Sequence, residues 1–381
     1  MPNETFSIAA AVLFPDDSIQ ESTVYLEGGR IARITPGRDP GADLSAAGTL
    51  IPGLIDLQVN GAYGHDFTLD GRTITPVAAR LSETGVTGFL PTIITSQFSA
   101  YPARLGEAAE AMRECAAEGF RGANVLGLHL EGPYLNPARK GAHPAECIRP
   151  VNVDEIRAWA DPALVRIVTL APELPGALEA VRALRAAGIL PSAGHSAATF
   201  DEAQAGFDAG IGWGTHLYSA MNPLLHRAPG LVGALLVSPI PCGLIVDGVH
   251  NHPSMVQVAW KAKGADGITL VTDCMAAMGM GPGRYALGQF VVTVDEHTAR
   301  LDENTLAGSI LTMDAAVRNT MAYTGCTLGE AVRAASTNPA RLLRLERKGR
   351  IAPGCDADLV LLSARNEVTH TFVAGRLVYQ R

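Results

Sequence analysis

Cysteine is scarce in this sequence, and its spacing matches no common motif. The six cysteines stand at positions 115, 147, 242, 274, 326 and 355, and no two of them form a CxxC pair. This spacing argues against a zinc ribbon and against a CxxC redox motif. So few thiols in 381 residues indicate a reducing compartment, and we expect a cytoplasmic protein.

An excess of positive charge and long apolar runs are also absent. The sequence has 30 Lys and Arg against 38 Asp and Glu, a formal net charge of −8. It therefore offers no basic surplus for nucleic acid or an anionic membrane, and we expect neither partner. No stretch reaches about 20 apolar residues, so no transmembrane helix is expected. Residues 1–18 have no basic segment before their apolar run and indicate a strand rather than a signal peptide.

The composition instead favours a large folded core. Hydrophobic residues make up 47% of the sequence and charged residues only 18%, which excludes a disordered chain. The 40 glycines and 24 prolines predict many tight turns. Such a composition is typical of a fold with many short strand–loop–helix units.

The two ends of the chain share a strand pattern. Apolar and polar residues alternate over 23–27 and 30–34, and again over 358–362 and 368–379. Neither end can bury its apolar face alone. We therefore expect both ends to form one small β-sandwich domain, from residues 1–51 and 350–381. Two separate extensions are the alternative.

The middle of the chain, residues 52–349, has a different rhythm. Apolar runs that end in polar residues recur at 54–60, 88–92, 125–131, 166–171, 190–195, 213–216, 243–247 and 268–273. Alanine-rich, helix-like stretches separate many of them. Eight such units predict an α/β fold with a (β/α)₈ TIM-like barrel, and a doubly wound open sheet is the alternative. Pro91 and Pro191 fall inside two of the runs, so the limits of those strands are hard to predict.

Three of these runs end in side chains that bind metals. Glu131, His195 and His216 end the third, fifth and sixth runs. One carboxylate and two imidazoles form a three-ligand site with a position open for water, as in catalytic zinc centres. Each residue alone also fits a structural role in a turn. The three converge only if their strands are neighbours in a closed barrel.

Asp273 ends the eighth run and is the candidate acid/base. A carboxylate beside a metal-activated water can take its proton and later donate it to a leaving amine. A turn or helix-capping aspartate is the alternative. Cys274 follows it, and we interpret this residue as a small buried side chain rather than a nucleophile.

Motifs along nearly the whole chain resemble a known family. Pro52–Asp56 and Gly354–Val360 are similar to the entry to and the exit from the barrel in the amidohydrolase superfamily. Within it, further blocks resemble the N-acetylglucosamine-6-phosphate deacetylase family. These blocks are 58–61, 129–134, 140–143, 194–196, 215–221, 247–250, 272–273 and 306–309.

The resemblance implies a reaction and a set of site residues. The reaction is hydrolysis of N-acetylglucosamine 6-phosphate to glucosamine 6-phosphate and acetate. The metal ligands fall on Glu131, His195 and His216, and the acid/base on Asp273. The implied substrate contacts are Ala142, Ser219, Ala220, Arg227, His250, Leu306, Ala307 and Gly308. His143 or His250 would donate a hydrogen bond to the oxyanion.

The resemblance also implies a cofactor and a partner. We expect one divalent metal ion per subunit, Zn²⁺ foremost, with Fe²⁺ and Co²⁺ also suited to a His₂Glu site. The substrate phosphate needs a cation, and Arg227 can offer it a bidentate fork. In the family, the loop that holds His226 and Arg227 reaches into the neighbouring subunit, which implies a homodimer.

Two departures from the family pattern matter. Gln58 and Asn60 stand where many amidohydrolases have His-x-His, which favours a single metal because amides are poor zinc ligands. His65 lies several residues further on and is interpreted as a loop histidine rather than a ligand of a second metal. Ser219 replaces an asparagine that contacts the sugar phosphate, so the N-acetylgalactosamine epimer is the alternative substrate.

Other readings fit the residues less well. A dihydroorotase-like or dipeptide-type amidohydrolase would show His-x-His and often a lysine after the fourth strand, where this chain has Ala171-Pro172-Glu173. A catalytically inactive barrel that acts as a binding protein would not need an intact ligand set. The long segment 276–310 alternates around Phe290–Val294 and predicts a β-hairpin.

Overall fold

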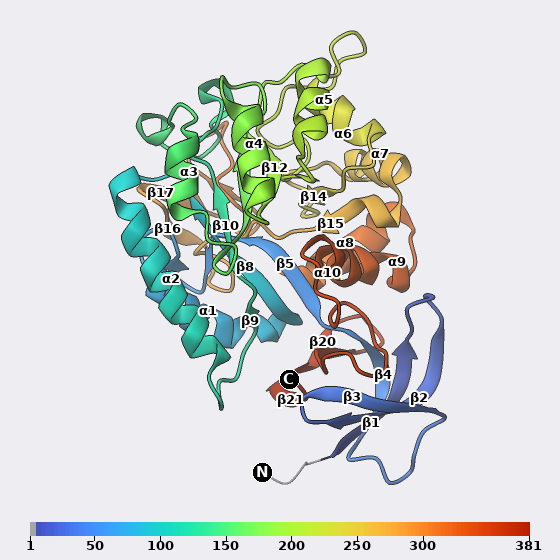
Figure 1. Ribbon diagram of the computed structural model, residues 1–381. Coiled ribbons are helices and arrows are strands. Elements are labelled where there is room, and N and C mark those ends of the chain that lie inside the picture. The colour runs from blue at the N-terminus through green and yellow to red at the C-terminus, as the bar shows by residue number, and fades with distance from the viewer. Residues whose placement is uncertain (1–4) are drawn as a thin grey trace.

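Strands from both ends of the chain form one sheet. The computed structural model describes residues 5–381, and Figure 1 shows this sheet below the main body. Its seven strands have the order β21-β20-β19-β4-β1-β2-β3. They are β1 (Phe6–Leu13), β2 (Ile19–Glu27), β3 (Arg30–Pro36), β4 (Leu44–Pro52), β19 (Leu359–Leu362), β20 (Val368–Val373) and β21 (Arg376–Gln380).

The two ends join through β4 and β19. These strands pair antiparallel, with Leu359 opposite Pro52 and Leu361 opposite Leu50. Leu50, Leu359 and Phe372 belong to one buried cluster, so each end supplies the apolar surface that covers the other. β4 ends at Pro52 and the next strand begins at Leu54. Only Gly53 therefore separates the last N-terminal strand of this sheet from the first strand of the barrel.

The middle of the chain forms a parallel barrel. Neighbouring strands follow the order β5-β8-β10-β11-β12-β13-β14-β15, and the short β9 (Asn124–Val125) also pairs with β8. The strands are β5 (Leu54–Val59), β8 (Val86–Ile94), β10 (Leu128–Glu131), β11 (Val165–Leu170), β12 (Leu190–Ala193), β13 (Trp213–Gly214), β14 (Cys242–Leu244) and β15 (Ile268–Leu270). The expected (β/α)₈ TIM-like barrel is confirmed, and the two terminal segments, expected as a small β-sandwich, form the single seven-stranded sheet described above.

The segment after β15 closes the barrel against β5. Val59 and Cys274 form a parallel bridge. The amide of Asp273 donates to the carbonyl of Gln58 at 2.9 Å, and the amide of Asn60 donates to the carbonyl of Cys274 at 2.8 Å. The first and last strands of the barrel are thereby held side by side at the end where the predicted site residues lie.

Helices cover the outside of the barrel (Figure 1). They are α1 (Ile74–Leu81), α2 (Tyr101–Ala116), α3 (Val153–Trp159), α4 (Ala177–Ala186), α5 (Phe200–Ala209), α6 (Gly230–Val237), α7 (Pro253–Lys263), α8 (Met313–Thr324), α9 (Leu328–Val332) and α10 (Asn338–Leu342). Local sequence sets some of their limits. At α5, Thr199 accepts from the amide of Glu202 while Glu202 accepts from the amide of Thr199, a capping box that starts the helix. No helix within residues 5–381 combines the length and the apolar character that a membrane crossing requires.

Several strands are shorter than the sequence pattern predicts. The run 125–131 is divided between β9 and β10, with Gly127 at φ +126° between them. A Cβ atom at this glycine would lie 2.2 Å from Cγ of Arg166, so the close approach requires glycine. The runs at 213–216, 243–247 and 268–273 contain a short strand followed by a loop. Both prolines in the runs, Pro91 and Pro191, lie within strands.

Two further sheets follow barrel strands. The predicted hairpin within 276–310 is present as β16 (Gly283–Leu287) and β17 (Phe290–Val294), with β18 (Ala299–Arg300) beside β17. These strands share a buried cluster with Ile94, Met275 and Ala307. A smaller hairpin, β6 (Gly61–Ala62) and β7 (His65–Asp66), follows β5.

Asp56 is a fully buried carboxyl group on β5. Its Oδ1 accepts from the amides of Gln58 and Thr272, both at 3.2 Å, and its Oδ2 lies 2.6 Å from Oγ1 of Thr272. Burial raises the pKa of Asp56 to about 7, although these hydrogen bonds lower it. The folded protein therefore holds a proton on this side chain between pH 4 and 7, where the unfolded chain does not.

This proton makes the contribution of Asp56 to stability depend on pH. Because the folded pKa is raised, the free energy of unfolding falls as pH rises from about 4 to 7, by at most about 1.4 kcal/mol per pH unit. The Asp56→Asn variant cannot titrate at this position. We therefore expect its free energy of unfolding, relative to that of the wild type, to increase as pH rises through this range. Urea unfolding at pH 5 and pH 7.5 measures the difference. The exposed Asp201→Asn variant is the control, and an Asp56→Asn difference that is equal at both pH values would contradict the assignment.

Candidate metal centre and active site

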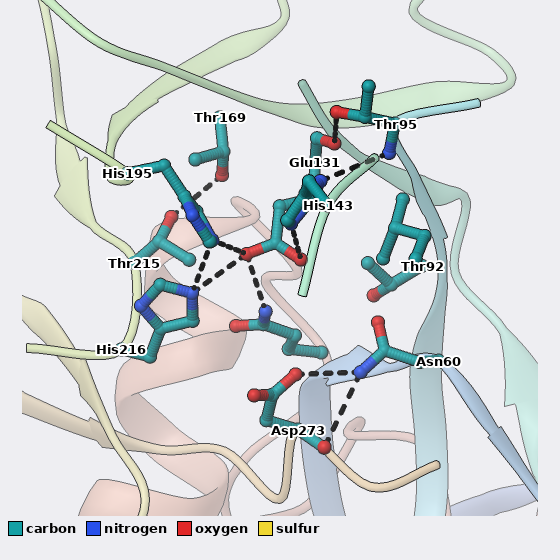
Figure 2. Close-up of polar contacts among 12 residues, drawn as sticks. Asn60, Thr92, Thr95, Glu131, His143, Thr169, His195, Thr215, His216 and Asp273 are labelled. Carbon is teal, nitrogen blue, oxygen red and sulfur yellow. Dashed lines mark hydrogen bonds and ion pairs between the residues drawn. The ribbon is translucent and has the colours of Figure 1, made fainter. Parts of the chain in front are cut away.

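Three predicted ligands meet at the mouth of the barrel. Glu131 is the last residue of β10, while His195 and His216 each lie two residues past the ends of β12 and β13. The Oε1 atom of Glu131 lies 3.1 Å from Nε2 of His195 and 2.8 Å from Nε2 of His216. The two Nε2 atoms lie 3.1 Å apart. Figure 2 shows the three side chains directed at one point.

The backbone at these strand ends is unusual. His195, His216 and Asp273 have φ values of 49°, 26° and 50°, in the left-handed region that favours glycine. Such conformations cost on the order of 1–3 kcal/mol each and are concentrated at functional sites. Here they occur where the chain leaves a short strand, and the side chains turn into the barrel mouth.

The donor set fits a cation. The Nδ1 atom of His195 lies 2.9 Å from the carbonyl of Arg139, which can only accept, so Nδ1 holds the proton and Nε2 presents a lone pair. That lone pair faces the carboxylate of Glu131. Within residues 5–381, Glu131, His195 and His216 form a group whose ligand atoms all lie within 4.8 Å of one another. One carboxylate oxygen and two imidazole nitrogens that converge on one point are a donor set that suits a divalent cation.

The pKa shifts at this point favour a negative carboxylate at Glu131 and a neutral imidazole at His195. Burial raises the pKa of Glu131, but contacts with His143, His195 and His216 outweigh burial and hold it well below its usual value. Burial and the neighbouring His143 lower the pKa of His195 to about 4. Burial also lowers the pKa of His216, but the Glu131 carboxylate outweighs it and the pKa is raised.

The amides that replace His-x-His act on their neighbours. Gln58 Nε2 donates to Glu131 Oε1 at 3.1 Å, so it supports the ligand as a donor. Its Oε1 atom is buried and has no hydrogen-bond partner among residues 5–381. His65 lies on the β7 hairpin and is not among the residues that line the cavity described below. This arrangement supports the predicted single metal.

Asp273 lies beside the ligands with one carboxylate oxygen held. Asn60 Nδ2 donates to its Oδ1 at 2.7 Å (Figure 2). No hydrogen bond of a described residue reaches Oδ2. Burial and the negative charge of Glu131 raise the pKa of Asp273 to about 6. The residue lines the cavity, so Oδ2 can accept a proton from a group bound there.

His143 presents an N–H group to the same space. Its Nδ1 atom accepts from the amide of Thr95 at 3.3 Å, so the ring proton is on Nε2. This Nε2 lies 3.6 Å from Oε2 of Glu131. His250 is held differently: its Nδ1 lies 2.7 Å from Oδ2 of Asp247, a carboxylate whose pKa is lowered despite its burial by the contact with His250.

These groups line a cavity of about 410 Å³, together with most of the residues predicted to contact the substrate. The predicted contacts in its lining are Ala142, His143, Ser219, Ala220, His250, Leu306 and Gly308. Ala307 is fully buried and packs beneath the loop instead. Arg227 is exposed and does not line this cavity. One chain therefore brings together all but these two predicted contacts.

The cavity also contains residues that sequence reasoning missed. Asn304 and Thr305 contribute polar groups to its wall, and Leu287 contributes an apolar one. Arg139, which the sequence places in a basic cluster with Lys140 and His143 after the third strand, lines the cavity as well. Arg139 is fixed by a hydrogen bond of 2.8 Å from Nε to Oδ1 of Asn222. The length of segment 276–310 was a signal that it covers the barrel mouth, but no pattern within it identified which side chains face the cavity.

Comparisons with known proteins agree with this geometry. The model of the Amidohydrolase family matches residues 49–378. An N-acetylglucosamine-6-phosphate deacetylase from Bos taurus is 42% identical over 347 residues, covering 87% of this chain and 83% of the relative. One from Lysinibacillus sphaericus is 39% identical, covering 95% and 94%.

Solved structures show the same likeness. The N-acetylglucosamine-6-phosphate deacetylase of Thermotoga maritima has a TM-score of 0.91 and 34% identity, covering 99% of this chain and 100% of its own. A Mycobacterium smegmatis variant in complex with N-acetyl-D-glucosamine-6-phosphate has a TM-score of 0.92 and 32% identity, with the same coverage. The chain therefore belongs to the amidohydrolase family, within its N-acetylglucosamine-6-phosphate deacetylase group.

Proposed function

We propose that this protein is a metal-dependent deacetylase that hydrolyses N-acetylglucosamine 6-phosphate to glucosamine 6-phosphate and acetate. The observation that carries the proposal is the convergence of Glu131, His195 and His216 beside Asp273 on one cavity. The relatives named above are deacetylases of this substrate. The six cysteines form no disulfide, which supports a cytoplasmic location. The proposed reaction is a step in the breakdown of amino sugars.

The proposed metal ligands are Glu131, His195 and His216, for one divalent ion per subunit. Two imidazoles and a carboxylate suit Zn²⁺, and Fe²⁺ or Co²⁺ are the alternatives. A cation there supplies Lewis-acid chemistry, because it lowers the pKa of a bound water and polarises the amide carbonyl. Gln58 and the carbonyl of Arg139 hold the ligands in orientation.

Asp273 moves the proton in this proposal. Its Oδ2 takes a proton from the attacking water and later donates it to the nitrogen of the leaving amino sugar. Asn60 holds Oδ1, so the carboxylate keeps one orientation for both steps. His143 offers its Nε2–H to the oxygen of the amide as negative charge develops there, because Thr95 fixes the proton on that nitrogen.

The sugar would lie against the loops around the cavity. Ser219 and Ala220 lie on one side, Ala142 on another, and Leu306 and Gly308 on the third. His250, held by Asp247, is a candidate for a sugar hydroxyl. Ser219 is shorter than the asparagine that the family commonly has, and this favours N-acetylgalactosamine 6-phosphate as the second candidate substrate.

The position of Arg227, the proposed phosphate ligand, supports a homodimer. Arg227 lies outside the cavity of its own chain, on an exposed loop that also exposes Leu224 and Leu225. Adjacent exposed apolar side chains on one loop favour contact with another protein surface. We infer that His226 and Arg227 reach the cavity of a second copy of this chain and that Arg227 binds the phosphate there.

A panel of substrates tests the reaction. We expect the metal-loaded protein to release acetate fastest, by kcat/KM, from N-acetylglucosamine 6-phosphate. N-acetylgalactosamine 6-phosphate and both unphosphorylated sugars are the comparisons, with acetate release as the measurement. A higher kcat/KM for the galactosamine epimer would favour the second candidate, and no turnover of any acetamido sugar would contradict the proposed function.

The roles of Glu131 and Asp273 predict different losses. Glu131→Gln removes a ligand charge and should lower the metal content measured by elemental analysis. Asp273→Asn should keep the metal but lower kcat by about 10²–10⁴-fold, the usual size of an acid/base contribution. Glu303→Gln, on an exposed loop, is the control for both. Full metal content in Glu131→Gln, or near wild-type turnover in Asp273→Asn, would contradict the respective role.

Arg227→Ala should raise KM for the phosphorylated sugar and leave the unphosphorylated sugar nearly unchanged, because only the phosphate needs the guanidinium. Mixing this variant with Asp273→Asn tests the dimer. If Arg227 acts across the interface, mixed dimers regain one complete site, and activity recovers toward about a quarter of wild type at equal amounts if subunits exchange freely. Equal KM changes for both sugars would contradict the role of Arg227 in binding phosphate. If subunits exchange but activity does not recover, Arg227 does not act in the site of the partner subunit.

A further inference from the structure

A second cavity, of about 360 Å³, lies at the other end of the barrel. Its lining includes Leu190, the first residue of β12, and Gly212 and Pro241, which directly precede β13 and β14. The catalytic candidates follow the carboxyl ends of strands, whereas this cavity opens at their amino ends. The two cavities are therefore separated by the length of the barrel core.

Arginines dominate the wall of this second cavity. Four of them line it, and the one carboxylate in the lining is Asp266. The arginines are Arg166, Arg185, Arg341 and Arg344. Asp266 already lies 3.6 Å from Arg341 and 3.5 Å from Arg333, which is outside the cavity. A concentration of positive charge stands out in a chain whose net charge is −8.

Two of the guanidinium groups have no partner in the fold. The side chains of Arg185 and Arg344 form no hydrogen bond or ion pair within the described part of the chain. Arg185 lies in the last turn of α4, and its stem packs on Gly210, where a Cβ atom would lie 2.8 Å from Cγ. Arg344 follows α10 with φ +56°, a conformation that glycine adopts at lower cost. Both residues are exposed, so their guanidinium groups are open to an anion from solvent.

Arg166 adds a third charge without a carboxylate. It lies near the start of β11, and its guanidinium donates to the carbonyl of Leu343 at 2.7 Å and of Leu126 at 3.4 Å. Burial lowers the pKa of this group. The contact with Leu343 also fixes the chain directly before Arg344.

We propose that this arginine pocket binds a small phosphorylated metabolite through its phosphate monoester. Guanidinium groups match phosphate oxygens with paired hydrogen bonds, and the two unpartnered groups, Arg185 and Arg344, can each offer such a pair to a dianion in the cavity. A volume of about 360 Å³ falls within the range of small-molecule sites and accommodates a pentose phosphate or a mononucleotide. The overall negative charge and the concave shape disfavour a nucleic acid or a membrane surface as the occupant.

Calorimetric titration of the metal-loaded protein at constant ionic strength tests the pocket. The probes are ribose 5-phosphate, AMP and inorganic phosphate, with ribose and adenosine as unphosphorylated counterparts. We expect saturable binding of at least one of the two esters, about one per chain, and none of ribose or adenosine. Tighter binding of inorganic phosphate than of both esters would overturn the assignment to a metabolite.

Paired variants place the binding in the pocket. The double variant Arg185→Gln/Arg344→Gln should bind the ester about tenfold more weakly or worse, because it loses two charged donors. Arg182→Gln is the matched control, since Arg182 is exposed on the same helix and does not line the pocket. It should bind within about twofold of wild type. Deacetylation by the double variant should stay at the wild-type rate, which also shows that it folds.

Three results would overturn the proposal. Equal affinity in the double variant and the wild type would place the phosphate elsewhere, including in the catalytic cavity. An equal loss in Arg182→Gln would show a general effect of surface charge. Absence of binding of both esters to the wild type would show that the pocket does not recognise this class of ligand. None of these results bears on deacetylation.

Discussion

Glu131, His195 and His216 present three ligand atoms to one point, although they come from three different strands. The distances among Oε1 and the two Nε2 atoms are 2.8 to 3.1 Å. The carbonyl of Arg139 orients His195 so that its Nε2 lone pair faces inward, and the carboxylate of Glu131 and the Nε2 atom of His216 converge on the same point. The left-handed backbone at both histidines has the same effect, since it turns the side chains from the strand ends into the barrel mouth.

Closure of the barrel determines the rest of the site. The segment that contains Asp273 is held against β5 by backbone hydrogen bonds, and this contact brings Asn60 to the carboxylate. Gln58, two residues before Asn60 on the same face of β5, reaches Glu131 instead. One segment therefore positions both the proposed metal ligand Glu131 and the proposed proton carrier Asp273. The side-chain amides of Gln58 and Asn60 donate hydrogen bonds to Glu131 and Asp273.

The two ends of the barrel differ in charge and in construction. At the carboxyl ends of the strands, histidines and carboxylates are buried and contact one another. At the amino ends, arginines surround a cavity and two of them lack partners in the described fold. Loops at the carboxyl ends of barrel strands usually carry catalysis. The unpaired arginines at the opposite end face solvent, so their charges stay hydrated. They leave that end with positive charge that is available to an anion.

The sequence by itself determined the fold class and the types of residue at the strand ends. Eight apolar runs and two patterned ends specify a barrel and a small β domain, because hydrophobic periodicity is a local property. The same runs placed Glu131, His195, His216 and Asp273 at strand ends. The sequence overestimated strand lengths, since the apolar residues of a strand and of the loop that follows it look alike.

Only the tertiary structure decided which side chains touch. Gln58 contacts Glu131 across 73 residues and Asn60 contacts Asp273 across 213, and no local pattern encodes such pairs. The exposure of Arg227 and the grouping of Arg166, Arg185 and Arg344 likewise depend on how distant segments pack. The physical reason is that a closed parallel barrel makes neighbours of strands through register and curvature, and these quantities are set by the packing of the whole chain.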